Sequence, residues 1–309
     1  MLCMASLHNH TRYSDGSFKL EELVERVALI NRQLAELRGM VIKGLAVVDH
    51  DFYPNEATLK AASDHASPIG IELIFGTEIC ADNDNVHVVG YGIDPTDFSF
   101  QRHLIKEQYK RLEAFEATCR KLNDFFKREG KTISLDRDVG LKMLKRDASG
   151  RIAEHGPLRW HYLREAMVER GMARTIREAN ILIGPVGPCY HQRETIDSVM
   201  AVERILRWKG KPVLAHPHRI PETFRERVIA SLIEVGLIGI EAYAEGYAEP
   251  EERNIYVQLA RRYDLLVLAG TDLHSRIEDV GRFLLPFEDF VRLRDYPLAL
   301  VRAGDMDMW

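Results

Sequence analysis

This chain of 309 residues lacks thiol motifs and long hydrophobic runs. Its four cysteines are far apart and form no CxxC pair, which argues against a disulfide framework or a zinc site built from thiolates. No apolar run approaches the ~20 residues that span a bilayer, and no signal-peptide pattern opens the chain. We therefore expect a cytoplasmic protein without membrane contact. Since no basic strip alternates with aromatic residues, we also expect no binding to extended duplex nucleic acid.

The composition that is present is that of a globular protein. The chain is 46% hydrophobic and 29% charged, with a formal net charge of -5. The charge is uneven, because residues 101–151 hold fourteen Lys and Arg against eight Asp and Glu. This basic segment could attract an anionic substrate, or it could simply be a solvated helical face.

Seven short apolar runs, mostly β-branched, predict buried strands. They are Met4–Leu7, Gly44–Val48, Ile71–Phe75, Val86–Tyr91, Pro212–Ala215, Ile238–Ala242 and Leu265–Ala269. Amphipathic stretches at 20–37, 55–65, 221–235 and 250–263 predict helices between most of them. Such alternation is typical of an α/β barrel or a doubly wound parallel sheet.

More than a hundred residues separate the fourth run from the fifth. This interval is a succession of helical patterns, with predicted helices at 103–128, 137–145, 158–170, 174–182 and 195–208 and no convincing strand. A structureless loop of that length is improbable. We therefore expect a discontinuous barrel, residues 1–97 and 196–309, that carries a helical insertion or cap at 98–195.

Nearly every predicted strand delivers a His, Asp or Glu at or near its carboxyl end. The first run ends in His8 and His10, whose i, i+2 spacing points both imidazoles to one side of an extended chain. The later positions, in chain order, are Asp15, His50, Glu78, His87, His216, Glu241, Asp272 and His274. A single such residue is more often a turn former or a cap, but seven strands converging on one barrel face favour an active site.

A bound cation is the economical partner for so many buried imidazoles and carboxylates. Six imidazoles and three carboxylates exceed what one ion uses, so two or three divalent ions are expected, and these donors suit Zn²⁺, Mn²⁺ or Fe²⁺. Such a cluster lowers the pKa of a bound water and stabilises an oxyanion, which is the chemistry of phosphate-ester hydrolysis.

The ordered set of motifs resembles the polymerase and histidinol phosphatase (PHP) family. In chain order the motifs are HxH with a following SDG, DHD, GxE, HxVGYG, AHP and GTDxH. The resemblance covers about 1–97 and 200–285 and implies a distorted seven-stranded (β/α) barrel with a trinuclear metal site, in which a hydroxide bridging two ions is the nucleophile.

The resemblance also implies a ligand set. The first ion would be held by His8, His10, Glu78 and Asp272, the second by Glu78, His87 and His216, and the third by Asp15, His50 and His274. Two positions depart from the family, since Ser6 stands where an acid is usual and Val48 where a Thr is usual. We expect these changes to alter metal preference without loss of the site.

The insertion narrows the resemblance to small bacterial PHP phosphoesterases that act on nucleoside 3′,5′-bisphosphates and RNA 5′ ends. The stretch PLRWHYL is similar to an element of that group, which also places an Arg after AHP. The phosphate-binding candidates are therefore Arg159 and Arg219, with His161 and His218 as further substrate-binding candidates. His161 and His191 are candidates for a catalytic role. The stretch Ala244–Glu252 does not match the group.

Three hypotheses about function follow. The first is a metal-dependent phosphoesterase acting on a nucleoside 3′,5′-bisphosphate or a short oligonucleotide. The second keeps the chemistry but takes histidinol phosphate or a sugar phosphate, including a cyclic one. The third is a non-catalytic metal-binding PHP module, and the filling of all nine ligand positions argues against it.

Overall fold

The computed structural model describes residues 1–82, 85–140, 144–146, 152–155, 158–244 and 250–298. Its strands are β1 Leu2–Asn9, β2 Met40–Val47, β3 Glu72–Ala81, β4 Val86–Tyr91, β5 Leu144–Arg146, β6 Ile152–His155, β7 Lys211–Leu214, β8 Gly239–Ala244, β9 Leu266–Gly270 and β10 Leu284–Pro286. Its longer helices are α1 Leu20–Arg38, α2 Glu56–Ala66, α3 Phe98–Phe125, α5 Trp160–Glu169, α6 Ile176–Ile183, α7 Ser198–Arg207, α8 Glu222–Glu234, α9 Pro250–Arg262 and α10 Phe287–Arg294. Short helical turns lie at Ser67–Ile69, Lys127–Glu129, Leu135–Gly140, Pro217–Arg219 and Ile277–Gly281.

The central sheet has eight strands in the order β10-β1-β2-β3-β4-β7-β8-β9. The α/β barrel expected from the sequence is confirmed, but the predicted count of seven strands is wrong by one, because the short strand β10 pairs with β1. An isolated parallel bridge from Asn9 to Leu273 brings the end of β1 beside the segment that follows β9. The sheet is therefore a nearly closed barrel.

The sheet is not wholly parallel. Strand β4 runs antiparallel to both β3 and β7, and β10 runs antiparallel to β1. The expectation that nearly every strand presents a ligand residue near its carboxyl end does not hold for β4, where His87 is the second residue. Because β3 and β4 form an antiparallel hairpin, the amino end of β4 meets the carboxyl end of β3. His87 therefore lies at the same rim as the carboxyl end of β3, although β4 runs in the opposite direction.

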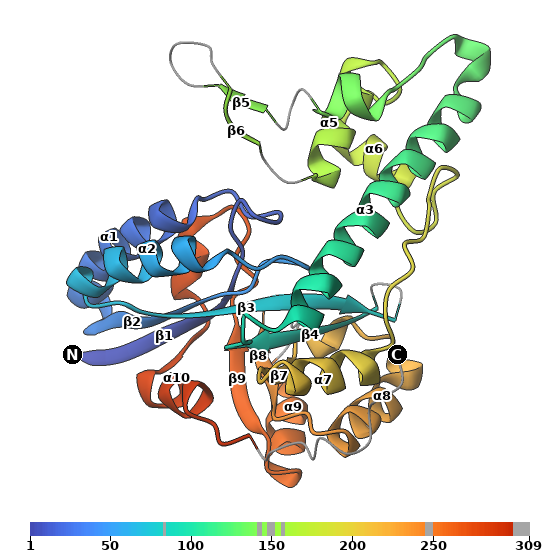
Figure 1. The fold of residues 1–309 in the computed structure, drawn as a ribbon. Coiled ribbons are helices and arrows are strands. Elements are labelled where there is room, and N and C mark those ends of the chain that lie inside the picture. The colour runs from blue at the N-terminus through green and yellow to red at the C-terminus, as the bar shows by residue number, and fades with distance from the viewer. Residues whose placement is uncertain (83–84, 141–143, 147–151, 156–157, 245–249, 299–309) are drawn as a thin grey trace. The chain divides into compact units, whose positions relative to one another are not determined.

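Local sequence signals set the helix boundaries. Asn55 accepts a hydrogen bond from the Thr58 backbone N–H at the start of α2, and Asp197 does the same for Val199 at the start of α7. Helix α1 ends at Gly39, whose φ of 62° suits glycine. Apolar faces of α1 and α2 pack on β2 and β3, whereas α7, α8 and α9 pack against β4, β7, β8 and β9 (Figure 1).

Two compact units are present, residues 1–104 with 195–309 and residues 105–194. The second unit has a core of its own that includes Phe115, Leu122, Leu163 and Met167. The prediction of an insertion without strands is wrong, because β5 and β6 form an antiparallel pair there. The helix predicted at 137–145 is also wrong: only a short turn covers 135–140, and 141–143 lie outside the described residues. Within the described ranges, no helix is long and apolar enough to cross a membrane.

Candidate metal centre

The structure brings all nine predicted ligand residues to one rim of the barrel. Their donor atoms fall into groups that could hold a metal ion, with the atoms of each group within 4.8 Å of one another. The groups are His10 with Asp15, His50 and His274; His8 with Glu78, His216 and Asp272; and His50 with Cys80 and His87. This grouping overlaps the set implied by the family resemblance but also includes a cysteine.

Glu78 lies at the middle of the cluster and has no exposed surface. Its Oε1 lies 2.8 Å from His87 Nδ1 and 3.0 Å from His216 Nε2. Its Oε2 lies 3.1 Å from His8 Nε2, 3.2 Å from His10 Nε2 and 3.1 Å from His50 Nδ1. One carboxylate therefore faces five imidazoles from four strands or their ends.

The surroundings of Glu78 keep it ionised. Burial alone would raise its pKa, but the neighbouring imidazoles outweigh burial and hold the pKa of Glu78 well below its usual range. Among the described residues, Oε2 has no hydrogen-bond partner although three imidazole nitrogens lie within 3.2 Å. A buried anionic oxygen with nitrogens at that distance and no hydrogen bond fits a site completed by a divalent cation.

The outer edge of the centre is formed around Asp15. Its Oδ2 lies 3.2 Å from His274 Nε2 and 3.8 Å from His50 Nε2, and the Asp15 side chain is about half exposed. The His10 ring stacks against the rings of both His50 and His274, with centroid distances of 4.6 and 4.5 Å. Asp15 therefore marks the solvent-exposed side of the metal centre, whereas Glu78 lies on its buried side.

Asp49 fixes the loop that presents Asp15. Its carboxylate accepts hydrogen bonds from the backbone N–H and hydroxyl of Thr11, at 2.8 and 2.5 Å, and from the backbone N–H and hydroxyl of Ser14, at 3.1 and 2.5 Å. Asp49 is fully buried, so these bonds hold the 11–14 turn against the end of β2.

The two residues that differ from the family pattern, Ser6 and Val48, lie close to this centre. Ser6 forms hydrogen bonds with Asn9 and Thr271, and Val48 is buried.

Glu241 supports the ligands from behind, a role that the strand pattern alone did not indicate. Its Oε1 lies 2.7 Å from His8 Nδ1, and its Oε2 accepts a 2.9 Å hydrogen bond from the backbone N–H of His216. A Cβ at Gly270 would lie 2.4 Å from this carboxylate, so the close approach of β9 requires glycine there. The sequence signal was a single charged residue inside the apolar run Ile238–Ala242.

The backbone at the centre is strained. His8, Asp272 and His216 have φ values of 59°, 50° and 24°, which L-residues rarely adopt. Asp51, next to His50, has a φ of 47°. Strain of this kind clusters at functional sites, where the surrounding structure holds it in place.

The imidazoles differ in how readily they hold a proton. Burial lowers the pKa of His50 to about 4 and also lowers the pKa of His216. For His10, burial is outweighed by the neighbouring carboxylates of Asp272 and Glu78, which raise its pKa to about 10. Since an imidazole must be neutral to bind a metal, a cation that enters this cluster displaces protons.

The predicted substrate-binding residues fall in both units. Arg219 and His218 follow His216 in the barrel, and Arg219 donates a hydrogen bond of 2.6 Å to Asp272 Oδ2. Arg159, His161 and His191 belong to the helical unit. Arg159 lies over the Tyr162 ring at 5.9 Å, and the exposed His161 pairs with Glu165 at 2.9 Å. The roles of these five residues stay predictions.

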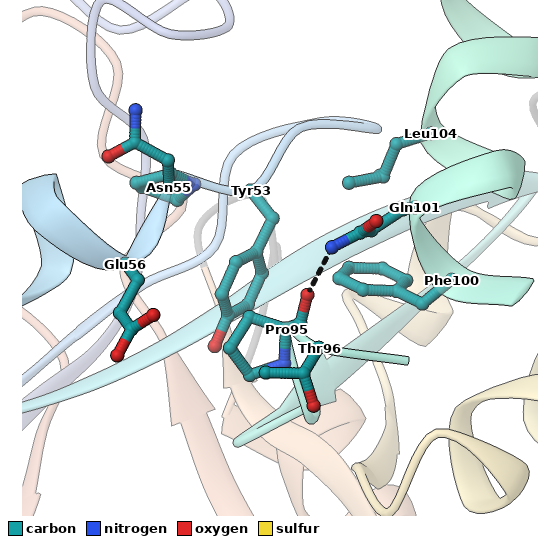
Figure 2. A pocket seen from close by; sticks show the side chains of 9 residues that line it. Tyr53, Asn55, Glu56, Pro95, Thr96, Phe100, Gln101 and Leu104 are labelled. Atoms are coloured by element: carbon teal, nitrogen blue, oxygen red, sulfur yellow. Dashed lines mark hydrogen bonds between the residues drawn. The ribbon is translucent and has the colours of Figure 1, made fainter. Parts of the chain in front are cut away.

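A cavity of about 270 Å³ lies between the start of α2 and the start of α3 (Figure 2). Tyr53, Phe100 and Leu104 supply apolar walls, and Gln101 Nε2 donates a 2.9 Å hydrogen bond to the Pro95 carbonyl. None of the predicted ligand residues lines it. The metal centre is therefore separate from this cavity.

Comparison with solved structures supports the class of fold. The chain matches a structure described as a metal-dependent phosphoesterase from Bifidobacterium adolescentis, with a TM-score of 0.72 and 23% identity over 96% of this chain and 97% of that one. It also matches an amidohydrolase from Chromobacterium violaceum with bound sulfate and no metal, with a TM-score of 0.66 and 26% identity over 90% of this chain and 89% of that one. No family model matches the chain.

Two curated relatives match most of the chain. A 3′,5′-nucleoside bisphosphate phosphatase of Chromobacterium violaceum is 28% identical and covers 89% of this chain and 90% of its own length. A phosphoribosyl 1,2-cyclic phosphate 1,2-diphosphodiesterase of Eggerthella lenta is 26% identical and covers 89% of this chain and 97% of its own length. The predicted resemblance to the PHP family, and within it to phosphoesterases of this kind, is confirmed.

Proposed function

We propose that this chain is a metal-dependent hydrolase of small phosphate esters, most readily a nucleoside 3′,5′-bisphosphate or a short oligonucleotide. The observation that carries the proposal is the buried Glu78 carboxylate, whose Oε2 faces three imidazole nitrogens without a hydrogen bond. The relatives agree on the class of reaction, since both are named for cleavage of phosphate esters, and the prediction of a phosphate-ester hydrolase is thereby confirmed.

A cyclic sugar phosphate is the second candidate substrate. It is favoured by the relative named for a phosphoribosyl 1,2-cyclic phosphate, which matches over the same share of this chain, 89%, as the nucleotide phosphatase does. Histidinol phosphate is a third candidate, and a non-catalytic metal-binding module is the alternative of another class. The shared chemistry is a phosphate ester held at the barrel rim.

The nine residues at that rim would hold the metal ions, with the Glu78 carboxylate at the middle of the group. Divalent ions supply Lewis acidity and lower the pKa of a bound water toward neutrality when they are present. Mn²⁺, Zn²⁺ and Fe²⁺ all accept these nitrogen and oxygen donors. Two or three ions, rather than one, would use the donors on both sides of Glu78.

In this proposal, residues of the chain orient the metal ligands and neutralise the charge of the phosphate. Glu241 fixes the His8 ring and the His216 backbone, so both imidazoles face Glu78 without rearrangement. Asp49 holds the turn that carries Asp15. The half-exposed Arg219 lies beside Asp272, where its guanidinium can bind two oxygens of a phosphate.

The proposal includes the domain organisation predicted from the sequence. The barrel, residues 1–97 and 196–309, would carry the metal chemistry. The insertion, residues 98–195, would act as a cap that supplies Arg159, His161 and His191 to the substrate. The expected cytoplasmic location and the lack of a membrane or duplex partner remain part of the same proposal.

Phosphate release from a nucleoside 3′,5′-bisphosphate in the presence of Mn²⁺ tests the function. We expect turnover in the natural protein and in His65→Ala, which lies outside the metal centre, and a loss of more than about 100-fold in His216→Ala. Hydrolysis of a ribose 1,2-cyclic phosphate alone would support metal-dependent hydrolysis at this site and would identify a cyclic sugar phosphate as the substrate class. Bound metal without release from any of these esters would contradict the proposed hydrolase and favour the non-catalytic module.

A further inference from the structure

We propose that Cys80 is a thiolate ligand in this metal centre, binding an ion together with His50 and His87. The inference deepens the proposed function, on which it rests, because it concerns the identity of the metal in the same site. The nine residues implied by the family resemblance include no sulfur donor. A tenth donor of different chemistry would change which metal the centre selects.

Strand geometry directs Cys80 into the centre. Cys80 follows Glu78 by two residues on β3, so both side chains lie on the same face of the sheet. Across the hairpin, Cys80 is the register partner of His87. The Cys80 side chain is 8% exposed, and its sulfur lies within 4.8 Å of donor nitrogens of His50 and His87.

The distances suit shared coordination of one ion. Cys80 Sγ lies 3.5 Å from His50 Nδ1. Two ligands of a tetrahedral zinc ion, with a Zn–S bond of about 2.3 Å and a Zn–N bond of about 2.0 Å, are separated by roughly 3.5 Å. The spacing therefore needs little adjustment when an ion enters.

A second observation points to a ligand at this place. Glu78 Oε2 is fully buried, has no hydrogen-bond partner among the described residues, and lies 3.1 Å from the same His50 Nδ1. The other oxygen of Glu78 lies 2.8 Å from His87 Nδ1. The two imidazoles that group with the Cys80 sulfur thus each also lie beside an oxygen of Glu78, so an ion held by Cys80, His50 and His87 would have this carboxylate next to it.

The alternative is that Cys80 only accepts a hydrogen bond from His50 Nδ1–H while His50 binds metal through Nε2, which faces Asp15 at 3.8 Å. The two arrangements predict different metal selectivity. A thiolate ligand favours Zn²⁺ and Co²⁺ over the harder Mn²⁺, whereas a sulfur outside the coordination shell has no such direct effect. They also differ in spectrum, because only a bound thiolate gives a sulfur-to-cobalt charge-transfer band.

The experiment is titration of the metal-free full-length protein with Co²⁺, followed by near-ultraviolet absorption and by equilibrium dialysis. Three proteins are compared: the natural chain, Cys80→Ser, and Cys119→Ser as a matched control. Cys119 is also buried but lies in the helical unit. Circular dichroism establishes that each variant is folded, and Cys80→Ala replaces the serine variant if that one is not.

We expect the charge-transfer band in the natural protein and in Cys119→Ser, and its loss in Cys80→Ser while other Co²⁺ ions remain bound. We also expect the preference for Zn²⁺ over Mn²⁺ to fall by about tenfold or more in Cys80→Ser. Bound Co²⁺ without the band in the natural protein, or a band that survives in Cys80→Ser, would overturn the proposal and leave the proposed function standing. No Co²⁺ binding by the natural protein would overturn both.

Discussion

Arg219 Nη2 donates a hydrogen bond of 2.6 Å to Asp272 Oδ2, although about half of the Arg219 side chain is exposed. A metal ion bound by Asp272 would compete for this carboxylate and leave the guanidinium available for an anion. The same contact therefore connects the predicted phosphate-binding residue to the predicted metal centre.

The first prediction concerns Arg219→Lys. The lysine keeps the positive charge but lacks the planar fork that binds two phosphate oxygens, so we expect kcat/KM for a phosphate ester to fall about 10- to 100-fold. The measurement is steady-state kinetics together with a Mn²⁺ titration. Unchanged kcat/KM would remove Arg219 from substrate binding. A fall in kcat/KM caused only by weaker Mn²⁺ affinity would show instead that Arg219 acts by positioning Asp272.

The second prediction concerns metal removal. An ion that binds only the native state adds about 2.7 kcal/mol to the free energy of unfolding when its concentration is 100 times its Kd. We therefore expect the Tm of the metal-loaded protein to fall by several degrees after treatment with a chelator. The Tm of Glu78→Gln should respond little, since this variant lacks the central carboxylate that would hold the ions. Equal responses in the two proteins would place the stabilising ion elsewhere.

The third prediction concerns Glu241→Gln. Glutamine keeps the size of the side chain but loses the charge that orients the His8 imidazole through Nδ1. We expect divalent-metal affinity to fall about 10- to 100-fold, as for other residues that hold a ligand in place. Calorimetric titration with Zn²⁺ measures the change, and Glu234→Gln, an exposed position on α8, serves as the control. Equal affinities in both variants would contradict the role of Glu241.

The fourth prediction separates the candidate substrates. The rings of Tyr13 and Phe52 stack with centroids 4.6 Å apart and planes at 8°, on the loops that carry Asp15 and His50. A nucleobase could stack on this pair, whereas a bare sugar phosphate could not. We expect Phe52→Ala to raise KM for a nucleoside bisphosphate about tenfold or more, from the loss of about 1–3 kcal/mol of stacking. KM for a ribose cyclic phosphate should stay constant, as should both values in Phe125→Ala. Equal increases for the two substrates would argue against base stacking.

The fifth prediction concerns pH and the helical unit. Burial raises the pKa of Asp138, but hydrogen bonds from Arg137, the Ser134 backbone N–H and Arg170 outweigh it and hold the pKa well below its usual range. A lowered pKa in the native state means that the stabilisation is present at neutral pH and is lost as the pH falls below about 4. Urea unfolding followed by circular dichroism should therefore show falling stability in acid.

The matched variants for this prediction are Asp138→Asn and Asp136→Asn. Asp138→Asn should lose about 2 kcal/mol at pH 7, because charged hydrogen bonds are replaced by weaker ones, and should show a smaller change between pH 7 and pH 3. Asp136 is exposed two residues earlier, so its variant should behave as the natural protein does. Identical acid profiles for all three proteins would contradict this role of Asp138.

Much of the metal centre could be predicted from the sequence because ligand residues sit at fixed places relative to strands. His8 lies near the end of β1 and His10 directly after it, and Asp272 and His274 follow β9 with the same spacing, although the positive φ of His8 and Asp272 departs from regular strand alternation. The apolar runs also located all seven of the longer strands of the sheet. These signals lie in short stretches of sequence, so they can be recognised without knowledge of the fold.

The features that were missed depend on contacts between distant segments. Strand β10 has only three residues and ends in Pro286, too short for a pattern to appear. The direction of β4 is defined by its antiparallel pairing with β3 and is not evident from its own composition. Glu241 was counted among the carboxylates near strand ends without a predicted contact, and Cys80 belongs to no cysteine motif. Only the folded barrel shows that both face imidazoles from other strands.

The positive φ values of His8, His216 and Asp272 have a consequence for how this centre can change. Each such residue costs about 1 kcal/mol or more relative to a relaxed backbone, and glycine would relieve that cost. In the metal-free chain, a glycine substitution that removes the ligand can therefore relieve backbone strain, although it also removes the stabilisation that a bound ion adds. Selection for the stability of the metal-free chain alone would favour glycine at these three positions. The ligand residues there are therefore the first that we expect such selection to replace.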